Sequence, residues 1–221
     1  MISRPLLIFD LDDTIISSFR SYRGLHQRIA GELNWPIPTR DDLVHYGPTW
    51  AATLQRLWPG RDLAPFCLRY DEIAHEHPCT AIPGVSQALE QLRASTYSLW
   101  IVSKRTRLRL AQRLREAAVD PGLFDGIYTS DEQPAPKPDP RCFDPIWERV
   151  GARRRAIYVG DRDEDRRAAT DAGLSFVAVR TGPENGEQWL DTLDPNCVID
   201  SAAWFPAWLD ENLPRVEESV L

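Results

Sequence analysis

Acidic residues crowd the end of an apolar segment near the start of the chain. The stretch IFDLDDTI, residues 8–15, places Asp10, Asp12 and Asp13 among side chains that favour a buried strand. A buried carboxylate without a partner is costly, so a cluster of this kind indicates a bound cation, a chemical reaction, or both. We therefore ask which other segments could share a site with these aspartates.

Other chemically active side chains follow later apolar segments. They are Ser103 at the end of LWIVS, Lys104 directly after it, Lys137 in the loop PAPKPDP, and Asp161 after IYVG, with Asp163 and Asp165 just beyond it. In an open α/β sheet, ligands bind outside the carboxyl ends of the parallel strands. Segments that are far apart in the sequence would then bring an acid pair, a hydroxyl, a lysine and a second acid cluster together.

The elements that position these groups alternate between strand and helix patterns. Strands that are apolar on both faces and alternate with helices predict an α/β fold, with a parallel sheet covered on both sides. The expected strands begin at Pro5, Tyr97, Gly126, Ala156 and Ser175, with a sixth at Asn196, and the clearest expected helices are Arg107–Ala118, Pro140–Val150 and Asp165–Ala172.

One long interval breaks this alternation. Between Ser17 and Ile82 there is no convincing strand, only helical segments interrupted by the prolines of NWPIPT, LWPGRD and HPCTAIPG. The interval is too long for a structureless loop in a compact domain. We therefore expect a core domain of residues 1–16 and 83–221, and a small helical domain of residues 17–82 inserted after the first strand.

Composition limits the classes of partner. The net charge of −7 argues against non-specific binding to nucleic acid or to anionic membranes, although a site with its own cations could still take an anionic substrate. No apolar run approaches the ~20 residues of a transmembrane helix, and the N-terminus lacks the features of a secretory signal. We expect a cytoplasmic protein whose four separated cysteines are reduced.

Four segments resemble the signature motifs of the haloacid dehalogenase superfamily, in its Mg²⁺-dependent phosphatase branch. They are DLDDT (Asp10–Thr14), VS (Val102–Ser103), KP (Lys137–Pro138) and GDRDED (Gly160–Asp165). The stretch from Ser98 to Gly173 is most similar to phosphoglycolate-phosphatase-type members. The resemblance implies a Rossmann-like core, and it places the helical insert where these enzymes carry a cap.

The resemblance also implies catalytic roles. Asp10 would attack phosphorus and form an aspartyl-phosphate, and Asp12 would serve as general acid for the leaving alcohol and later as base for water. Ser103 would donate a hydrogen bond to a phosphoryl oxygen, and Lys137 would stabilise the nucleophile and the transferring group electrostatically. These four residues are the expected catalytic set.

A carboxylate can attack a phosphate dianion only if charge is neutralised, which calls for a hard cation such as Mg²⁺. The resemblance implies that the side chains of Asp10 and Asp161 and the main-chain carbonyl of Asp12 hold this metal. Asp165 would support the metal's water or the motif lysine. Asp163 gives the acidic loop one extra candidate.

Substrate selection would depend on residues outside these motifs. In capped relatives it comes from the cap, where the candidates are Arg20, Tyr22, Arg23, His26 and Arg56. An arginine suits a second anionic group, as in phosphoglycolate. Our substrate-binding candidates are Arg20, Arg23 and Lys104. We interpret the arginines of KRTRLRLAQRLRE, residues 104–116, as a solvated helix face.

The resulting hypothesis is a Mg²⁺-dependent phosphatase that acts on a small phosphorylated metabolite. A phosphomutase of the β-phosphoglucomutase type uses the same motifs and is the nearest enzymatic alternative. A dehalogenase is disfavoured because that branch does not use the aspartate represented by Asp12. A catalytically silent binding or regulatory module with the same fold is the alternative from a different class. The oligomeric state is not predicted.

Overall fold

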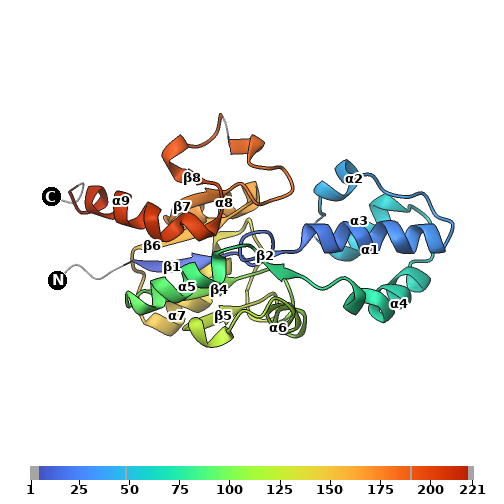
Figure 1. Cartoon of the computed structure of the whole chain (residues 1–221), viewed down its shortest axis with the longest axis horizontal. Coiled ribbons are helices and arrows are strands. Elements are labelled where there is room, and N and C mark those ends of the chain that lie inside the picture. The colour runs from blue at the N-terminus through green and yellow to red at the C-terminus, as the bar shows by residue number, and fades with distance from the viewer. Residues whose placement is uncertain (1–4, 48, 190, 219–221) are drawn as a thin grey trace. The chain divides into compact units, whose positions relative to one another are not determined.

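The computed structural model describes residues 5–47, 49–189 and 191–218, with side chains up to residue 213. The chain forms two compact units, which can be followed in Figure 1. One unit is Ser18–Cys79, and the described residues on either side of it make up the other. For comparison, the helical insert expected from the sequence comprises residues 17–82.

The larger unit is built on a parallel sheet, so the expected α/β fold is confirmed. Its strand order is β5–β4–β1–β6–β7–β8, which places the first strand of the chain between β4 and β6. In the described residues the strands are β1 (Leu6–Phe9), β4 (Ser98–Val102), β5 (Gly126–Tyr128), β6 (Ala156–Gly160), β7 (Ser175–Val179) and β8 (Val198–Ile199).

Helices cover both faces of this sheet because the strands carry apolar side chains on both. Leu6 and Ile8 of β1 pack in one cluster with Ile146 of α7. Phe9 meets Phe205 of α9 edge to face, with ring centroids 5.7 Å apart. Alternate residues of a strand point to opposite faces, so the two helix layers bury opposite sides of β1. The helices are α5 (Val85–Ala94), α6 (Arg107–Glu116), α7 (Asp144–Val150), α8 (Asp163–Asp171) and α9 (Phe205–Glu218).

A two-stranded ribbon joins the larger unit to the insert, and the sequence did not predict it. β2 (Ile16–Ser17) pairs antiparallel with β3 (Thr80–Ala81), and the amide of Ile82 donates to the carbonyl of Ile15 at 3.0 Å. The expectation of no convincing strand between Ser17 and Ile82 is therefore wrong at Ser17 and at Thr80–Ala81. Two residues are too few to show an alternating pattern, which explains the miss.

The smaller unit is helical around an aromatic core. Leu25, Ile29, Trp58 and Phe66 are buried in one cluster, and partly buried Trp35 packs against it. Threonine side chains begin two of its helices: Thr39 caps α2, and Thr49 caps α3 by accepting from the amide of Ala52. The helices are α1 (Phe19–Glu32), α2 (Arg40–Val44), α3 (Trp50–Leu57) and α4 (Ala64–Ile73).

Two further sequence-based expectations can be compared with the described residues. The four cysteines are free thiols, as expected. No helix within 5–47, 49–189 or 191–218 combines the length and the apolar character needed to cross a bilayer. Short 3-10 turns lie at Ala74–Glu76, Pro121–Leu123, Pro140–Phe143, Glu187–Trp189, Pro195–Cys197 and Ala202–Trp204.

Candidate active site

The carboxyl ends of three neighbouring strands bring the motif residues to one edge of the sheet. Asp10 follows β1, and its amide donates to the carbonyl of Val159 on β6 at 2.9 Å. Ser103 follows β4, and its amide donates to Tyr128 of β5 at 3.0 Å. Asp161 follows β6 directly. The strand ladder therefore sets the spacing of these loops, as the topology predicts.

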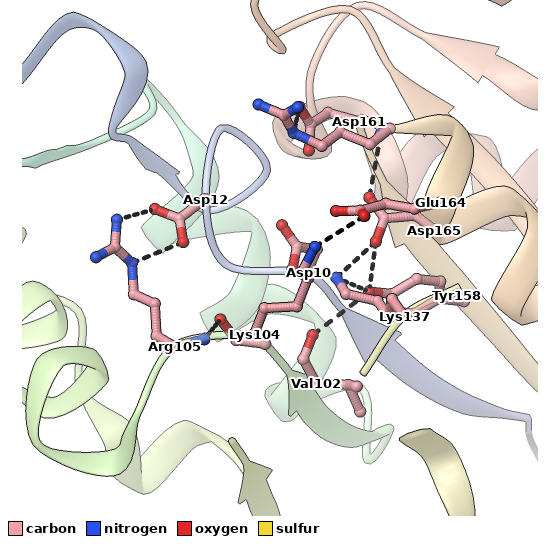
Figure 2. Close-up of polar contacts among 12 residues, drawn as sticks. Asp10, Asp12, Val102, Lys104, Arg105, Lys137, Tyr158, Asp161, Glu164 and Asp165 are labelled. Atoms are coloured by element: carbon pink, nitrogen blue, oxygen red, sulfur yellow. Dashed lines mark hydrogen bonds and ion pairs between the residues drawn. The ribbon is translucent and has the colours of Figure 1, made fainter. Parts of the chain in front are cut away.

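Lys137 lies between two acidic side chains. Its Nζ donates to Oδ1 of Asp10 and to Oδ1 of Asp165, each at 2.6 Å (Figure 2). Only 4% of Lys137 is exposed. Burial alone would lower the pKa of Lys137, but the two carboxylates outweigh that effect and raise its pKa well above the usual value, so the lysine is a fixed cation.

Tyr158 on β6 is a further member of this network that the sequence did not single out. The Lys137 ammonium donates to its hydroxyl at 2.8 Å, and the hydroxyl donates to Oδ1 of Asp165 at 3.0 Å. Tyr158 is fully buried. A buried tyrosine hydroxyl needs a polar partner, and this requirement within an apolar strand was the signal available in the sequence.

Asp165 is held from both of its carboxylate oxygens. Oδ1 accepts from Lys137 and Tyr158, while Oδ2 accepts from the amide of Arg162 at the start of α8, at 3.1 Å. Gly160 leaves room for it, because a Cβ there would lie 2.7 Å from Oδ2 of Asp165. The extra candidate Asp163 lies elsewhere: it is exposed and pairs with Arg166 at 2.6 Å.

Asp161 differs from Asp165 in that neither of its carboxylate oxygens accepts a hydrogen bond from the described residues. Only 1% of the residue is exposed, and the nearest cation, Nε of Arg162, is 3.9 Å from Oδ2. Burial, with help from the neighbouring carboxylates of Asp165, Asp13 and Asp10, raises the pKa of Asp161 well above its usual value. A buried carboxyl group without hydrogen bonds needs an explanation.

A metal ion fits this donor set. Asp10, Asp161 and Asp165 each offer a carboxylate oxygen, and these atoms lie within 4.8 Å of one another. Burial raises the pKa of Asp10 to about 7; Lys137 opposes the shift, and Asp165 and Asp12 add to it. Two cations lie beside these three buried carboxylates, the ammonium of Lys137 and the guanidinium of Arg162, so one negative charge stays uncompensated when all three acids are ionised. Oxygen ligands and excess negative charge are what a hard divalent cation requires.

Asp12 forms an ion pair that the sequence did not predict. Its two carboxylate oxygens each accept one bond from Arg105, from Nε and from Nη2, both at 2.7 Å (Figure 2). About a quarter of each side chain is exposed. Arg105 precedes α6 and belongs to the stretch interpreted as a solvated helix face, so that interpretation is wrong for Arg105. It is also wrong for Arg113, which is 3% exposed.

Ser103 and Lys104 lie beside this pair. Ser103 is buried, and its Oγ accepts from the amide of Arg105 at 3.2 Å, so the hydroxyl proton is not used in that bond. Lys104 donates to Oε2 of Glu164 at 2.9 Å (Figure 2). The turn after β4 thus places two consecutive cations against acids from two different segments, the loop after β1 and the first turn of α8.

The candidates in the helical unit fall into two classes. Arg20 and Arg23 are exposed on α1 and have no ion pair with the described residues. Arg56 instead donates to the main-chain carbonyls of Asp42 and His45, both at 2.6 Å. These two bonds hold the C-terminal end of α2 and the residue that follows it. Arg56 therefore has a structural role, and its candidacy for substrate binding is not supported.

His26 is a core residue rather than a substrate contact. It is fully buried; its Nδ1 donates to the carbonyl of Tyr22 at 2.7 Å, and its Nε2 accepts from the indole of Trp50 at 3.3 Å. Burial lowers the pKa of His26 to about 4, so the ring is neutral at neutral pH. The suggestion that His26 faces a substrate is wrong.

Comparisons with known proteins agree with one another. The family model for haloacid dehalogenase-like hydrolases matches residues 7–179. A phosphoglycolate phosphatase from Agrobacterium fabrum is 30% identical over 223 residues, covering 94% of this chain and 93% of the relative. The pyrophosphatase PpaX of Oceanobacillus iheyensis is 25% identical, covering 88% and 91%. A solved haloacid dehalogenase-like family hydrolase from Streptococcus pneumoniae shares the fold, with a TM-score of 0.74 at 19% identity, covering 93% and 98%.

Proposed function

Because this chain belongs to the haloacid dehalogenase-like hydrolases, we propose that it is a Mg²⁺-dependent phosphatase that cleaves a small phosphate monoester through an aspartyl-phosphate. The observation that carries the proposal is the buried arrangement of Asp10, Lys137 and Asp161. It combines a carboxylate nucleophile, a fixed cation beside it, and an acid whose oxygens are left for a metal.

Asp10 has one carboxylate oxygen available for chemistry. Oδ1 accepts the bond from Lys137, and among the described residues no donor reaches Oδ2. Attack by a carboxylate oxygen on phosphorus forms a new P–O bond and breaks the bond to the leaving alcohol. Lys137 stabilises the negative charge of both the nucleophile and the transferring group without moving, because Asp165 and Tyr158 fix its position.

Asp12 supplies the proton transfers. In the first step its carboxyl group gives a proton to the leaving alcohol, and in the second its carboxylate takes a proton from the water that attacks the aspartyl-phosphate. Arg105 donates to both oxygens of the ionised Asp12 and so fixes the orientation of this group; one of these two bonds must open when Asp12 carries the proton. Ser103 has a hydroxyl proton to donate to a phosphoryl oxygen.

The side chains of Asp10 and Asp161 and the main-chain carbonyl of Asp12 would hold the Mg²⁺, and the cation would neutralise charge between the nucleophile and the phosphate dianion. Asp165 does not need to bind the metal directly, because both of its oxygens already accept hydrogen bonds. Its role is to hold Lys137. The set of roles implied by the sequence motifs is therefore consistent with the contacts of each carboxylate.

The helical unit acts as the cap that selects the substrate. The relatives include phosphatases for phosphoglycolate and for pyrophosphate, two substrates that carry a second anionic group. Arg20 and Arg23 are exposed arginines suited to such a group, and Lys104 is a third cation close to the motif residues. We place substrate selection on these three side chains.

The test is release of inorganic phosphate from p-nitrophenyl phosphate, with Mg²⁺ and with a chelator. The wild type should release phosphate only with the metal, and Asp10→Asn should be inactive. Asp163→Asn is the matched control, because Asp163 is an exposed acid paired with Arg166 outside the site. Equal rates for the wild type and Asp10→Asn would disprove the proposal.

The same preparation then separates the substrate classes. Phosphoglycolate, pyrophosphate and a hexose phosphate should be compared at one Mg²⁺ concentration, with the wild type and with Arg20→Ala and Arg23→Ala. A phosphatase releases phosphate to water from the preferred substrate. Conversion of a sugar phosphate to its isomer without release of phosphate would support the phosphomutase instead.

A further inference from the structure

Asp161 raises a structural problem that its proposed role as a metal ligand does not answer. A carboxylate that binds a metal must keep at least one oxygen lone pair for it, and without any hydrogen bond nothing polar orients such a group in the metal-free protein. Asp165 shows the other case, because three donors fix its carboxylate. Asp161 accepts no such bond from the described residues, yet it is almost completely buried. Some other contact must hold its side chain in place.

Gly182 lies directly against the Asp161 side chain. A Cβ placed on Gly182 would overlap Oδ2 of Asp161 and would lie 2.8 Å from its Cβ and 3.0 Å from its Cγ. Contacts under 3.0 Å are sterically forbidden, so the absence of a side chain at Gly182 permits this close approach. The backbone at Gly182 therefore packs directly beside the Asp161 side chain without using a hydrogen bond.

Gln188 holds the same residue from its main chain. Its Nε2 donates to the main-chain carbonyl of Asp161 at 2.9 Å, across 27 residues of sequence. The Oε1 of Gln188 is buried and accepts no hydrogen bond from the described residues. The amide group is therefore placed for its contact with Asp161, at the cost of leaving its oxygen unsatisfied.

A third contact ties the same segment to the loop after β1. Thr181 Oγ1 donates to the main-chain carbonyl of Asp13 at 2.6 Å. Residues 181–188, which follow β7, therefore contact both acidic loops of the site. None of the catalytic or metal-binding roles described above is assigned to this segment.

We propose that residues 181–188 are a positioning element for the metal site: Gly182 packs against the Asp161 side chain and Gln188 anchors its main chain, and together they set the affinity for Mg²⁺. The proposal deepens the proposed function, since it depends on Mg²⁺ binding at Asp161. Partners behind a metal ligand typically change metal affinity by about 10–100-fold when they are removed.

The experiment measures Mg²⁺ binding itself, by titration calorimetry and by the rise in melting temperature that Mg²⁺ produces in the full chain. Gln188→Ala should weaken the Kd for Mg²⁺ about tenfold or more, and Gly182→Ala should do the same because its new methyl group displaces the Asp161 carboxylate. The controls are Gln91→Ala, an exposed glutamine of α5, and Gly31→Ala, where a Cβ would meet nothing within 4 Å.

A merely structural role gives a different result. In that case Gln188→Ala lowers the melting temperature measured with a chelator but leaves the Kd for Mg²⁺ at the wild-type value, and the proposal is wrong. If Gly182→Ala does not fold, as judged by circular dichroism, Gln188→Ala alone decides, because Gln188 lies in a partly exposed 3-10 turn.

The two proposals can fail separately. If Gln188→Ala weakens Mg²⁺ binding while the wild type shows no phosphatase activity, the positioning element is supported and the proposed function is disproved. Phosphate release with the same Mg²⁺ affinity in wild type and Gln188→Ala would do the reverse. No Mg²⁺ binding by the wild type would overturn both.

Discussion

Replacing Lys137 with methionine should expose the charge balance of the site most clearly. Lys137 Nζ lies 2.6 Å from one oxygen of Asp10 and 2.6 Å from one oxygen of Asp165. Methionine keeps most of the side-chain volume and removes only the charge and the hydrogen bonds. The variant therefore leaves buried carboxylates without their one nearby ammonium.

The expected loss of stability can be worked from these contacts. Two unit charges at 2.6 Å attract by about 6 kcal/mol at an effective dielectric constant of about 20. Part of that attraction offsets the cost of burying the lysine, so removal of one partner of a buried pair costs about 3–5 kcal/mol in practice. We expect the free energy of unfolding of Lys137→Met, measured at pH 8.5 with a chelator, to fall by that amount.

The loss should depend on pH in a defined direction. The folded-state pKa of Asp10 is about 7 with Lys137 present, above its unfolded value, so protonation of Asp10 stabilises the fold and that stabilisation is lost as the pH rises to about 7. Without Lys137 this pKa rises further. Above pH 7 the wild type should therefore be insensitive to this group, while the variant loses about 1.4 kcal/mol per pH unit.

Urea unfolding at pH 7.0 and 8.5 provides the measurement, and Lys104→Met provides the matched control. Lys104 contacts Glu164 at 2.9 Å, and both side chains are partly exposed, so its loss should cost no more than about 1 kcal/mol. Equal losses in the two variants, or a loss in Lys137→Met that is the same at both pH values, would refute the electrostatic reasoning.

Three other predictions test separate parts of the site. Asp161→Asn should abolish the stabilisation of the protein by Mg²⁺. Without metal, this variant should be at least as stable as the wild type, because a buried carboxyl group without hydrogen bonds has been removed. Melting temperatures measured with and without Mg²⁺ test both expectations. The Kd for Mg²⁺ should weaken by at least about fivefold from pH 7 to pH 6, because binding must displace a proton from Asp10 and the raised pKa of Asp161 acts in the same direction. Equal Kd values at pH 6 and pH 7 in titration calorimetry would contradict this. Arg105→Met should lower kcat, but by less than the roughly 10²–10⁴-fold expected for Asp12→Ala. Arg105→Lys should not restore the rate, because an ammonium group cannot bind both carboxylate oxygens as the guanidinium does. An unchanged kcat of Arg105→Met in steady-state kinetics would remove Arg105 from the mechanism.

The location of the site could be predicted from the sequence because it depends on strand ends. Asp10, Ser103 and Asp161 each follow an apolar strand directly, and parallel strands end at the same edge of a sheet. Lys137 is in a loop, and only its motif indicated that it would reach the same place. Local pattern and chain topology were therefore sufficient for Asp10, Ser103 and Asp161.

The partners of these residues could not be predicted in the same way, because they are set by packing between distant segments. Arg105 and Asp12 are 93 residues apart, and nothing in an arginine-rich helix start shows which arginine turns toward an acid. Gln188 contacts a main-chain carbonyl, which leaves no trace in side-chain patterns. His26 shows the opposite error: a polar residue type suggested function, whereas the aromatic core of the helical unit buries it as a neutral ring.

The central claim is that Asp10 carries the phosphoryl group during turnover. Rapid acid quench of the wild type with a saturating phosphorylated substrate and Mg²⁺, followed by peptide mass spectrometry, tests it directly. The account predicts one phosphoryl group on the peptide that contains Asp10, accumulating in Asp12→Asn and missing in Asp10→Asn. Turnover that proceeds while the peptide stays unmodified in both the wild type and Asp12→Asn would contradict the account.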